Sequence, residues 1–583
     1  MEASPTIPTT ITSQTTYDTT TQEIVTEEVP SQSLVPLVDQ VEVGADVTLN
    51  TNDEDEAATP ATITTLNDDD ITNQEYVEEV PVESRIPPVD GGEVGVVFAL
   101  NENDEDVHAT MASTLPTTVI IQSNHNRRYL RLDGGYQELN NALRCEGDYS
   151  FGIETRFELV PSTTATGLFH IRSLYNNKYW QTTSGTNGWT IPGATEPEED
   201  RSSVRCTLFQ PVFTVSNSNR IVRLRHVNTG IYVRRFHGTS SGNYVGVLTV
   251  RPKNQPTDKT DEFTLLDSKT VVVLPDLIRI KSLDNENHLY ARSDAYLDFT
   301  DIANNSSAYD YEVFPSRNGG VRLKSVLRGT YWTEESEKYI RLRQASTTIH
   351  DTNTVFIPTV LSGDRVLLRS LRSNNLCKRY SRNNRPQWRS RLSARASYPD
   401  QACYMEIEEP VDSRTISNVR YRLSDARIYN ERTTGLVTDE TVNRLDVPVQ
   451  SELNLTETVT NTTNWSRSVT LTIGVTISGS AGVPFVSGGS FEISTEVANS
   501  WDWGETKEES QQVGSVRSVD VPPMTRVRGT LMATRLSYDI PFSYTQTDVL
   551  KNGKTVVHLK DDGLFTGHNG YGYYYEIVPL PLG

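Results

Sequence analysis

The sequence Ile120-Ile121-Gln122-Ser123, followed by Asn126 and Tyr129-Leu130, decides the fold because the chain repeats it at a nearly fixed distance. The further copies are His170-Ile171-Arg172-Ser173 with Asn176 and Tyr179-Trp180, and Arg223-Leu224-Arg225-His226 with Asn228 and Tyr232-Val233. They are offset by 50 and 53 residues, and each copy is followed by another short apolar segment. A repeat of this length indicates a supersecondary unit that cannot bury its hydrophobic face alone.

A second triplet of the same kind follows: Ile280-Lys281-Ser282, Leu323-Lys324-Ser325 and Leu368-Arg369-Ser370, offset by 43 and 45 residues. Three four-stranded units of this length close into a β-trefoil, which leaves no long free strand edges. The sequence therefore predicts an all-β protein with two tandem trefoils, residues 116–268 and 269–411. A β-propeller fits less well, because the spacing breaks between the third and fourth copies.

The first 115 residues have a different composition. They carry 25 Asp and Glu residues against the single Arg85, whereas the remaining residues carry 51 acidic and 53 basic ones. This acidic tail has little apolar surface to bury, so residues 1–115 are predicted to be largely disordered. Its segment Glu27–Pro30 returns as Glu78–Pro81, which marks an internal duplication. The near-neutral remainder argues against nucleic acid as a partner, since such binding needs a basic face.

Residues 412–583 lack the trefoil repeat and are predicted to form a separate β module. Apolar and polar residues alternate over Val469–Ile477 and again over Phe491–Val497, and the glycine-rich stretch Gly479–Gly489 between them is predicted to be a turn. The apolar residues of this segment are the candidate membrane contacts: Val469, Leu471, Ile473, Val475, Ile477, Val483, Phe485, Val486, Phe491, Ile493 and Val497.

Both arms of this predicted hairpin are near the length of a membrane-crossing strand. Such a strand needs about 9–11 residues, with one row facing lipid and one facing water. The odd-numbered residues are then predicted to face lipid, and Glu492 and Glu496 to face the lumen. A single hairpin would leave backbone groups unpaired in lipid, so a homo-oligomer is expected. An ordinary sheet with one buried face gives the same alternation, and periodicity alone favours that interpretation.

In the first triplet, Leu168–Tyr179 and Ala194–Phe209 resemble the agglutinin domain of the amaranthin-like plant lectins. The resemblance extends over both trefoils. It implies trefoils that dimerise and bind glycans containing galactose and N-acetylgalactosamine in clefts between subunits.

The loop Gly185–Trp189 falls where this resemblance places a polar and aromatic sugar site, so Thr186, Asn187 and Trp189 are the candidate carbohydrate contacts. Pyranose faces stack on aromatic rings, while sugar hydroxyls need short polar side chains. The positions that resemble the family's Asn, His and Tyr hold Thr186, Asn187 and Gly188 here. Burial of Trp189 in the core is an equally good alternative. Trp180 and Trp332, which follow the repeated tyrosines, are predicted to be barrel-core residues.

In the last module, Val519–Leu531, Ile540–Tyr544 and Asp561–Phe565 resemble the aerolysin and epsilon-toxin superfamily, and above all the plant proteins that join amaranthin and aerolysin modules. The resemblance implies a soluble form that oligomerises and refolds a hairpin into a transmembrane barrel.

Enzymatic functions find little support in the sequence. The chain has no His-Glu-x-x-His segment and no phosphate-binding glycine loop before a helix, so no enzyme activity, cofactor or metal site is expected. Its four cysteines are too few and too scattered for a disulfide scaffold. Neither a secretory signal nor 18 consecutive apolar residues are visible, which predicts a soluble cytoplasmic or nucleocytoplasmic form that enters membranes only on activation.

Three functions compete on these grounds. The first is a glycan-binding lectin that forms membrane pores, in plant defence or the stress response. The second is a multivalent lectin whose aerolysin-like module only drives oligomerisation. The third is a trefoil scaffold or inhibitor that binds proteins.

Overall fold

The computed structural model describes residues 115–582, apart from 134–138, 185–186, 217–218, 238–243, 252–257, 302–305, 345–350, 362–364, 382–389, 469–474 and 501–502. Every described residue belongs to one compact unit, which the chain forms over Gly95–Gly583. The disorder predicted for the acidic tail therefore concerns residues outside the described part.

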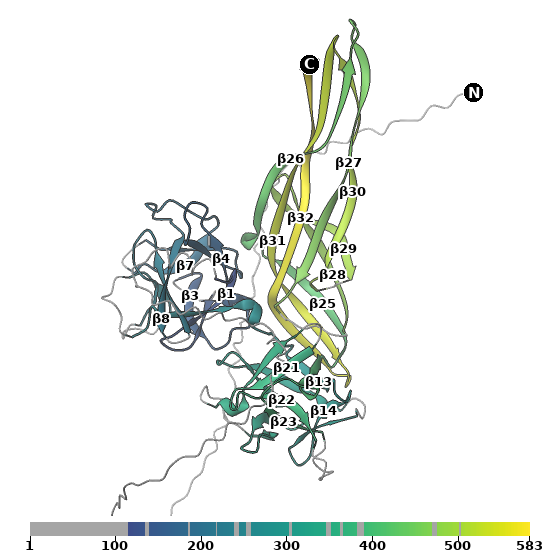
Figure 1. Ribbon diagram of the computed structural model, residues 1–583. Helices are drawn as coiled ribbons and strands as arrows, with labels where there is room; N and C mark the ends of the chain where they lie inside the picture. The colour runs from purple at the N-terminus through teal and green to yellow at the C-terminus, as the bar shows by residue number, and fades with distance from the viewer. Residues whose placement is uncertain are drawn as a thin grey trace, which may run out of the picture. The chain divides into compact units, whose positions relative to one another are not determined.

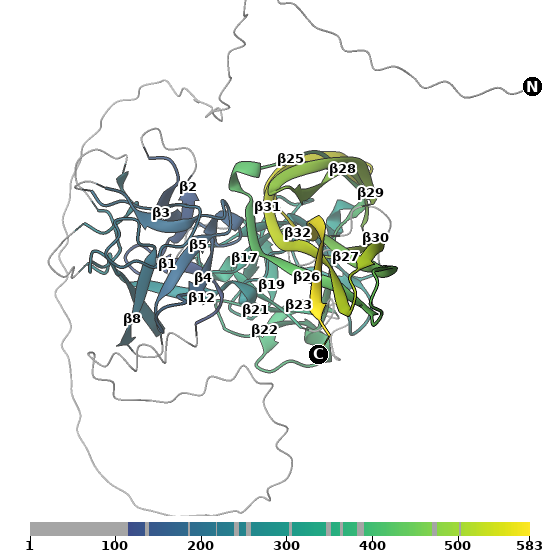
Figure 2. The ribbon, with the colours of Figure 1, turned by 90° about the horizontal axis from the view of Figure 1, so that it is seen from above.

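The first repeat triplet forms a closed barrel of antiparallel strands. The six barrel strands are β1 (Thr118–Ser123), β4 (Arg156–Pro161), β5 (Phe169–Ser173), β8 (Leu208–Ser216), β9 (Asn219–His226) and β12 (Phe263–Asp267). Each pairs with the next in this order, and β12 pairs with β1 to close the ring. Three hairpins form the cap: β2 (Tyr129–Asp133) with β3 (Ala142–Gly147), β6 (Tyr179–Thr182) with β7 (Thr190–Ala194), and β10 (Arg234–Arg235) with β11 (Leu248–Thr249). Figure 2 shows the barrel strands gathered together.

The second triplet forms a barrel of the same construction. Its six barrel strands are β13 (Leu277–Ser282), β16 (Tyr311–Pro315), β17 (Val321–Ser325), β20 (Phe356–Val360), β21 (Arg365–Ser370) and β24 (Met405–Glu408). They also close into a ring. The cap hairpins are β14 (His288–Ala291) with β15 (Leu297–Thr300), β18 (Tyr331–Glu334) with β19 (Ile340–Arg343), and β22 (Leu376–Tyr380) with β23 (Arg391–Ala396).

Short 3₁₀ turns repeat the threefold pattern of the second trefoil. The turns Ser307–Tyr309, Thr352–Thr354 and Gln401–Cys403 precede β16, β20 and β24, and each is capped by a side chain, of Ser306, Asp351 and Asp400 respectively. Further 3₁₀ turns that lie wholly within the described residues are Ile153–Thr155, Ser268–Thr270 and Leu423–Asp425.

The repeated tyrosine–tryptophan pairs explain why both barrels close. Trp180 and Trp332 are fully buried at the centres of the two barrel cores. Trp180 meets Phe157 and Phe209 edge-on, and Trp332 meets Tyr311 and Phe356 in the same way, with ring centroids 5.2–5.8 Å apart. The predicted all-β class with two trefoil-like barrels is confirmed, and the two tryptophans lie in the core as expected.

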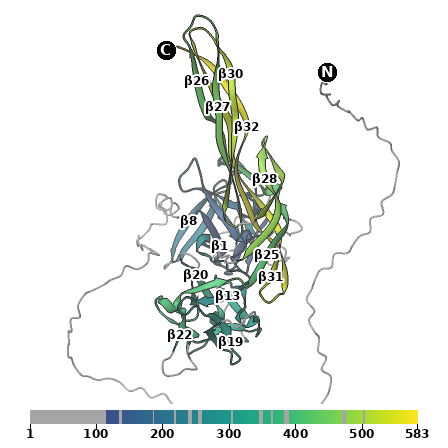
Figure 3. The same ribbon diagram turned by 90° about the vertical axis from the view of Figure 1, so that its right-hand side faces the viewer.

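The C-terminal module is built from long strands. They are β25 (Val411–Tyr421), β26 (Arg427–Asn443), β27 (Val449–Ser466), β28 (Thr476–Ser487), β29 (Ser490–Ser500), β30 (Thr506–Val521), β31 (Thr525–Leu550) and β32 (Thr555–Pro581). β31 and β32 pair along nearly their whole length, and Figures 1 and 3 show them as the long spine of the module. β25 and β26 pair successively along the other edge of β31, whereas β27 pairs with both β32 and β30.

This module has two apolar clusters rather than one core. The first lies between the β26–β31–β32 strands and the β27–β30 pair, around Leu453, Leu455 and Leu531. The second, around Trp465, Tyr538 and Phe565, is covered by the β28–β29 hairpin. β28 joins the sheet by a short parallel pairing with β25, from Ser413 opposite Thr476 to Ile416 opposite Gly479. The hairpin is thus attached at one end and packed along the rest.

Candidate functional site

Trp189, the main predicted sugar contact, lies in an aromatic cluster at the cap of the first trefoil. Only 8% of the residue is exposed. Its ring stacks on Tyr244 with centroids 5.2 Å apart and meets Phe236 edge-on at 5.3 Å. Leu139, Ala142, Ile191 and Val247 complete the cluster. Because these neighbours cover the indole, the structure places Trp189 in the core of the cap and not on a sugar-facing surface.

The local chain geometry accounts for this correction. Trp189 directly precedes β7 and forms a β-bridge with Thr249 of β11, which draws it between two cap hairpins. Asn187 is exposed, and its backbone carbonyl accepts a hydrogen bond from the Thr249 hydroxyl. Thr186 lies outside the described residues. Sugar contact by Asn187 and Thr186 stays a prediction.

In the C-terminal module, β28 and β29 form an antiparallel hairpin that turns at Gly488-Gly489. Both glycines have positive φ, 59° and 79°, as the tight two-residue turns of β-hairpins require. Ser487 pairs with Ser490, and Val486 with Phe491. The predicted long turn over Gly479–Gly489 is therefore wrong. Residues up to Ser487 continue the strand, because only the last two of these residues adopt the left-handed conformation.

The register of the hairpin shifts twice, between Ser478 and Ala481 and between Gly482 and Pro484. An offset of one residue moves every following side chain to the opposite face. Counted from the two-residue turn, Phe485 lies opposite Glu492, although Phe485 was expected on the lipid-facing side and Glu492 on the lumen side. Val483 packs against the cluster that contains Val486 and Tyr538. Next to the turn, odd-numbered residues of β28 thus pair with even-numbered residues of β29, which differs from the predicted pattern.

The predicted membrane contacts lie in different environments. Val486 is buried, Ile493 is 46% exposed, and Val475, Ile477, Val483, Phe485 and Phe491 are half-buried. Val469, Leu471 and Ile473 lie outside the described residues, as does the side chain of Val497. Membrane contact by these residues stays a prediction.

The face of the hairpin that carries Val486 and Phe491 packs against the second cluster of the module. Phe491 meets Tyr538 edge-on, with centroids 5.8 Å apart. Val486 and Ala481 belong to the same buried cluster as Tyr538. This contact hides apolar hairpin surface from water at about 25 cal/mol per Å². Release of the hairpin must uncover both its own face and the core beneath it.

A buried ionic network lies where the hairpin segment begins. Arg414 of β25 binds Asp548 through its Nε, 2.7 Å from Oδ1, and Glu409 through its Nη2, 2.5 Å from Oε2. Arg467 approaches the same Glu409, with Nη2 3.7 Å from Oε1. The four side chains are at most 7% exposed. Burial alone lowers the pKa of Arg414, but its hydrogen bonds to Asp548 and Glu409 raise that pKa above its ordinary value.

The next residue, Ser468, is also held in place. Its backbone N–H and its hydroxyl both donate to Asp562 Oδ2, at 3.2 and 2.5 Å, while the hydroxyl of Tyr544 donates to Asp562 Oδ1. Uncompensated charges are costly in such a buried place, so the network stays intact only while all its members remain together. It therefore fixes the chain entering the hairpin segment to β25, β31 and β32.

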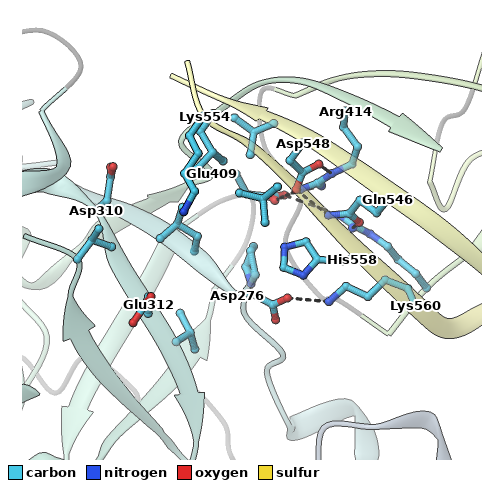
Figure 4. A pocket seen from close by; sticks show the side chains of 18 of the residues that line it. Asp276, Asp310, Glu312, Glu409, Arg414, Gln546, Asp548, Lys554, His558 and Lys560 are labelled. Atoms are coloured by element: carbon cyan, nitrogen blue, oxygen red, sulfur yellow. Dashed lines mark hydrogen bonds and ion pairs between the residues drawn. The ribbon is translucent and has the colours of Figure 1, made fainter. Parts of the chain in front are cut away.

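Figure 4 shows a pocket of about 430 Å³ beside this network. Asp276, Asp310 and Glu312 of the second trefoil line it together with Gln546, His558 and Lys554 of the module. Lys560 Nζ binds Asp276 Oδ2 across it at 2.7 Å. Because acidic and basic side chains line the pocket together, they neutralise one another more than they select an ion of one sign.

Sequence analysis did not single out this network or the pocket. Glu409, Arg414, Arg467 and Asp548 are separated by up to 139 positions and belong to no short motif. The one local signal was the position of Arg467, a charged residue two positions before the alternating segment that starts at Val469.

Among the described residues, no helix is long and apolar enough to cross a membrane. Nor does that part of the chain contain a group of three His, Cys, Asp or Glu side chains that could hold a metal ion.

Comparison with known proteins identifies part of the chain. The agglutinin domain family matches residues 113–267. Natterin-1 and natterin-2 of Thalassophryne nattereri are 23% and 24% identical to this chain over 150 residues, which is 26% of this chain and 42% and 40% of theirs. The match thus spans about two fifths of the length of these relatives.

Several solved structures show weaker likenesses. The hemolytic lectin CEL-III is 9% identical over 78% of this chain and 92% of its own, with a TM-score of 0.29. An aerolysin-like protein of Bombina maxima matches 29% of this chain and 99% of its own length, at 12% identity and a TM-score of 0.20. TM-scores in this range are too low to establish a shared fold.

The closed six-stranded barrel, its three cap hairpins and the family match agree over the first trefoil. Residues 113–267 thus match the agglutinin domain family, and the chain is similar in sequence to the natterins over 150 residues.

Proposed function

We propose that this protein is a non-enzymatic lectin that binds glycans on a membrane, assembles into a homo-oligomer and inserts the hairpin segment to form a pore. The observation that carries the proposal is the state of the β28–β29 hairpin. One face is apolar and packed on the module, and its far end is an exposed two-glycine turn. Within the described part of the chain, main-chain pairing attaches it to the sheet only through residues 476–479. Such a hairpin can leave without dismantling the strands beneath it.

The agglutinin domain supports the lectin part of this proposal. Galactose- and N-acetylgalactosamine-containing glycans are the ligands that the family resemblance implies. Since the indole of Trp189 is covered, the sugar contacts must come from other residues of the trefoils. Binding to a glycan array tests the proposal, and the absence of any glycan ligand would favour a protein-binding trefoil instead.

A disulfide between β25 and β28 tests the pore. The hydroxyls of Thr415 and Ser478 lie 3.3 Å apart on these paired strands, so the Thr415→Cys/Ser478→Cys variant brings two thiols together. The four native cysteines are fully buried. We expect the oxidised variant to bind glycan-bearing liposomes without releasing calcein, and reductant to restore leakage.

A matched lock controls for the presence of a disulfide. Thr433 of β26 and Thr534 of β31 also place exposed hydroxyls 3.1 Å apart, but away from the hairpin. Leakage from the oxidised Thr433→Cys/Thr534→Cys variant should equal that of the native protein. If the oxidised Thr415→Cys/Ser478→Cys variant releases as much calcein as the native protein, the aerolysin-like module drives oligomerisation only. The multivalent lectin then becomes the better proposal. A role in plant defence and a cytoplasmic location stay predictions.

A further inference from the structure

Among the described strands, none pairs with the outer edge of β28 beyond its short pairing with β25. That pairing ends at Gly479, opposite Ile416. In the two-residue hairpin, Val486 and the alternate residues before it direct their backbone groups away from β29, toward this edge. Gly482, Pro484 and Val486 therefore carry backbone groups that no strand pairs.

Three side chains take the place of the missing strand. The hydroxyl of Tyr421 donates to the carbonyl of Gly482 at 2.9 Å, and the hydroxyl of Tyr538 donates to that of Pro484 at 2.9 Å. The amide of Asn569 binds Val486 twice: its Nδ2 donates to the carbonyl at 2.8 Å, and its Oδ1 accepts from the N–H at 3.1 Å. Each successive outward carbonyl is satisfied.

These three residues come from different strands and are held firmly. Tyr421 ends β25, Tyr538 lies in β31 and Asn569 lies in β32. Tyr538 is 1% and Asn569 7% exposed. Burial raises the pKa of Tyr421 to about 12, so its hydroxyl remains a donor across the physiological range. Buried carbonyls without partners are costly, so each donor contributes to holding the hairpin down.

We propose that Tyr421, Tyr538 and Asn569 form a latch that keeps the hairpin in its soluble position and sets how readily it is released. The effect of the latch on pore formation rests on the proposed function, whereas its hydrogen bonds are a property of the soluble protein. The latch opens from the turn inward. The Val486 end is held by side-chain hydrogen bonds and apolar packing without main-chain pairing to the sheet, while residues 476–479 keep their main-chain pairing with β25.

Hydrogen exchange of the full-length soluble protein tests the latch without a membrane. Tyr538→Phe removes one hydroxyl and keeps the ring. We expect the amides of β28 and β29 to exchange about tenfold faster, equivalent to about 1.4 kcal/mol in local opening. Tyr311→Phe is the matched control, since its buried hydroxyl also donates to a backbone carbonyl, that of Leu289 in the second trefoil. It should leave hairpin exchange unchanged.

Asn569→Asp supplies a second, reversible test. At neutral pH the carboxylate has no donor for the Val486 carbonyl, so hairpin protection should fall. Acidification protonates the carboxyl and returns an O–H donor, so protection factors corrected for intrinsic exchange should recover in this variant and not in Tyr538→Phe. Hairpin protection equal to native in both variants overturns the latch. If either variant fails to fold by circular dichroism, Tyr421→Phe replaces it.

Liposome leakage then separates the two proposals. With the latch weakened, leakage should begin at a lower protein concentration than for Tyr311→Phe. If the native protein and every variant leave liposomes intact while hairpin exchange accelerates as expected, the latch stands and the pore proposal fails. If the native protein forms pores and hairpin exchange does not change, the latch fails and the pore proposal stands.

Discussion

In the first trefoil the cap hairpins meet around Trp189, whereas in the second they meet around Tyr339, which occupies the same place. Each residue directly precedes the second strand of the middle hairpin, and each bridges to the third hairpin, Trp189 to Thr249 and Tyr339 to Ser393. Both are buried, at 8% and 2% exposure. Their neighbours differ: aromatic and aliphatic side chains surround Trp189, while arginines and tyrosines surround Tyr339.

The cap of the second trefoil is held by charge and by rings together. Arg391 and Arg341 lie over the ring of Tyr296, with Cζ 3.7 and 4.2 Å from its centroid. Arg395 lies over both Tyr339 and Tyr380, at 4.7 and 4.9 Å. The barrels beneath remain alike, with Trp180 and Trp332 in equivalent packing. Closing the barrel thus requires similar core residues in both trefoils, whereas the centre of the cap can be packed with either apolar or charged side chains.

The largest effect should come from the apolar cap. Trp189→Ala removes a buried indole that no ion pair or water can replace, and we expect a loss of about 3–5 kcal/mol from the first trefoil. Hydrogen exchange of β6 and β7 reports this loss separately from the second trefoil. Trp189→Phe should recover most of it. If Trp189→Ala instead keeps its stability and binds glycans more weakly, Trp189 is a sugar contact after all.

The charged cap should respond next most strongly. Arg391 is 4% exposed and places its Nε 3.6 Å from Asp298 Oδ1. Arg391→Met keeps an apolar stem but leaves Asp298 with Arg292 as its remaining ion-pair partner, at 3.0 Å. Breaking a buried pair from one side is costly, so we expect a loss of about 3 kcal/mol in the second trefoil. A stability equal to native would mean that Arg292 alone compensates the carboxylate.

Sequence analysis predicted the barrels well because the repeats carry their core in the same local order. The pairs Tyr179-Trp180 and Tyr331-Trp332 mark equivalent positions that can be recognised from the local sequence alone. The cap gave no such signal. Whether Trp189 faces a sugar or a core depends on Phe236 and Tyr244, which lie about fifty residues away and outside the repeated pattern.

The hairpin shows the same limit. Its alternation and its glycines were visible, but the turn position depends on which glycines adopt positive φ. Which residues share a face depends on that turn and on register shifts further along the two strands. Neither leaves a unique trace in composition. The latch donors Tyr421, Tyr538 and Asn569 come from three strands, so only the folded module brings them to one edge.

The two caps should also differ in pH response. Burial raises the pKa of Asp298, although Arg292 and Arg391 oppose this shift. A raised pKa means that the folded state binds the proton more tightly than the unfolded state, so protonation stabilises the fold. The stability of the native protein relative to Asp298→Asn should therefore be greatest at low pH and fall as pH rises through the raised pKa. If the difference in stability between the native protein and Asp298→Asn does not change with pH, titration of Asp298 does not affect stability.

The smallest effect should come from the rim of the charged cap. Arg395 is exposed, yet its guanidinium lies between the rings of Tyr339 and Tyr380. Exposed cation–π contacts are worth about 0.5–1 kcal/mol, so Arg395→Gln should cost the second trefoil at most about 1 kcal/mol. Arg365→Gln is the matched control, because Arg365 is also exposed and no ring contact is found for it among the described residues. Equal midpoints of denaturant unfolding for the two variants would show that these rings do not stabilise the arginine. The difference between the caps would then lie in the buried Arg391 alone.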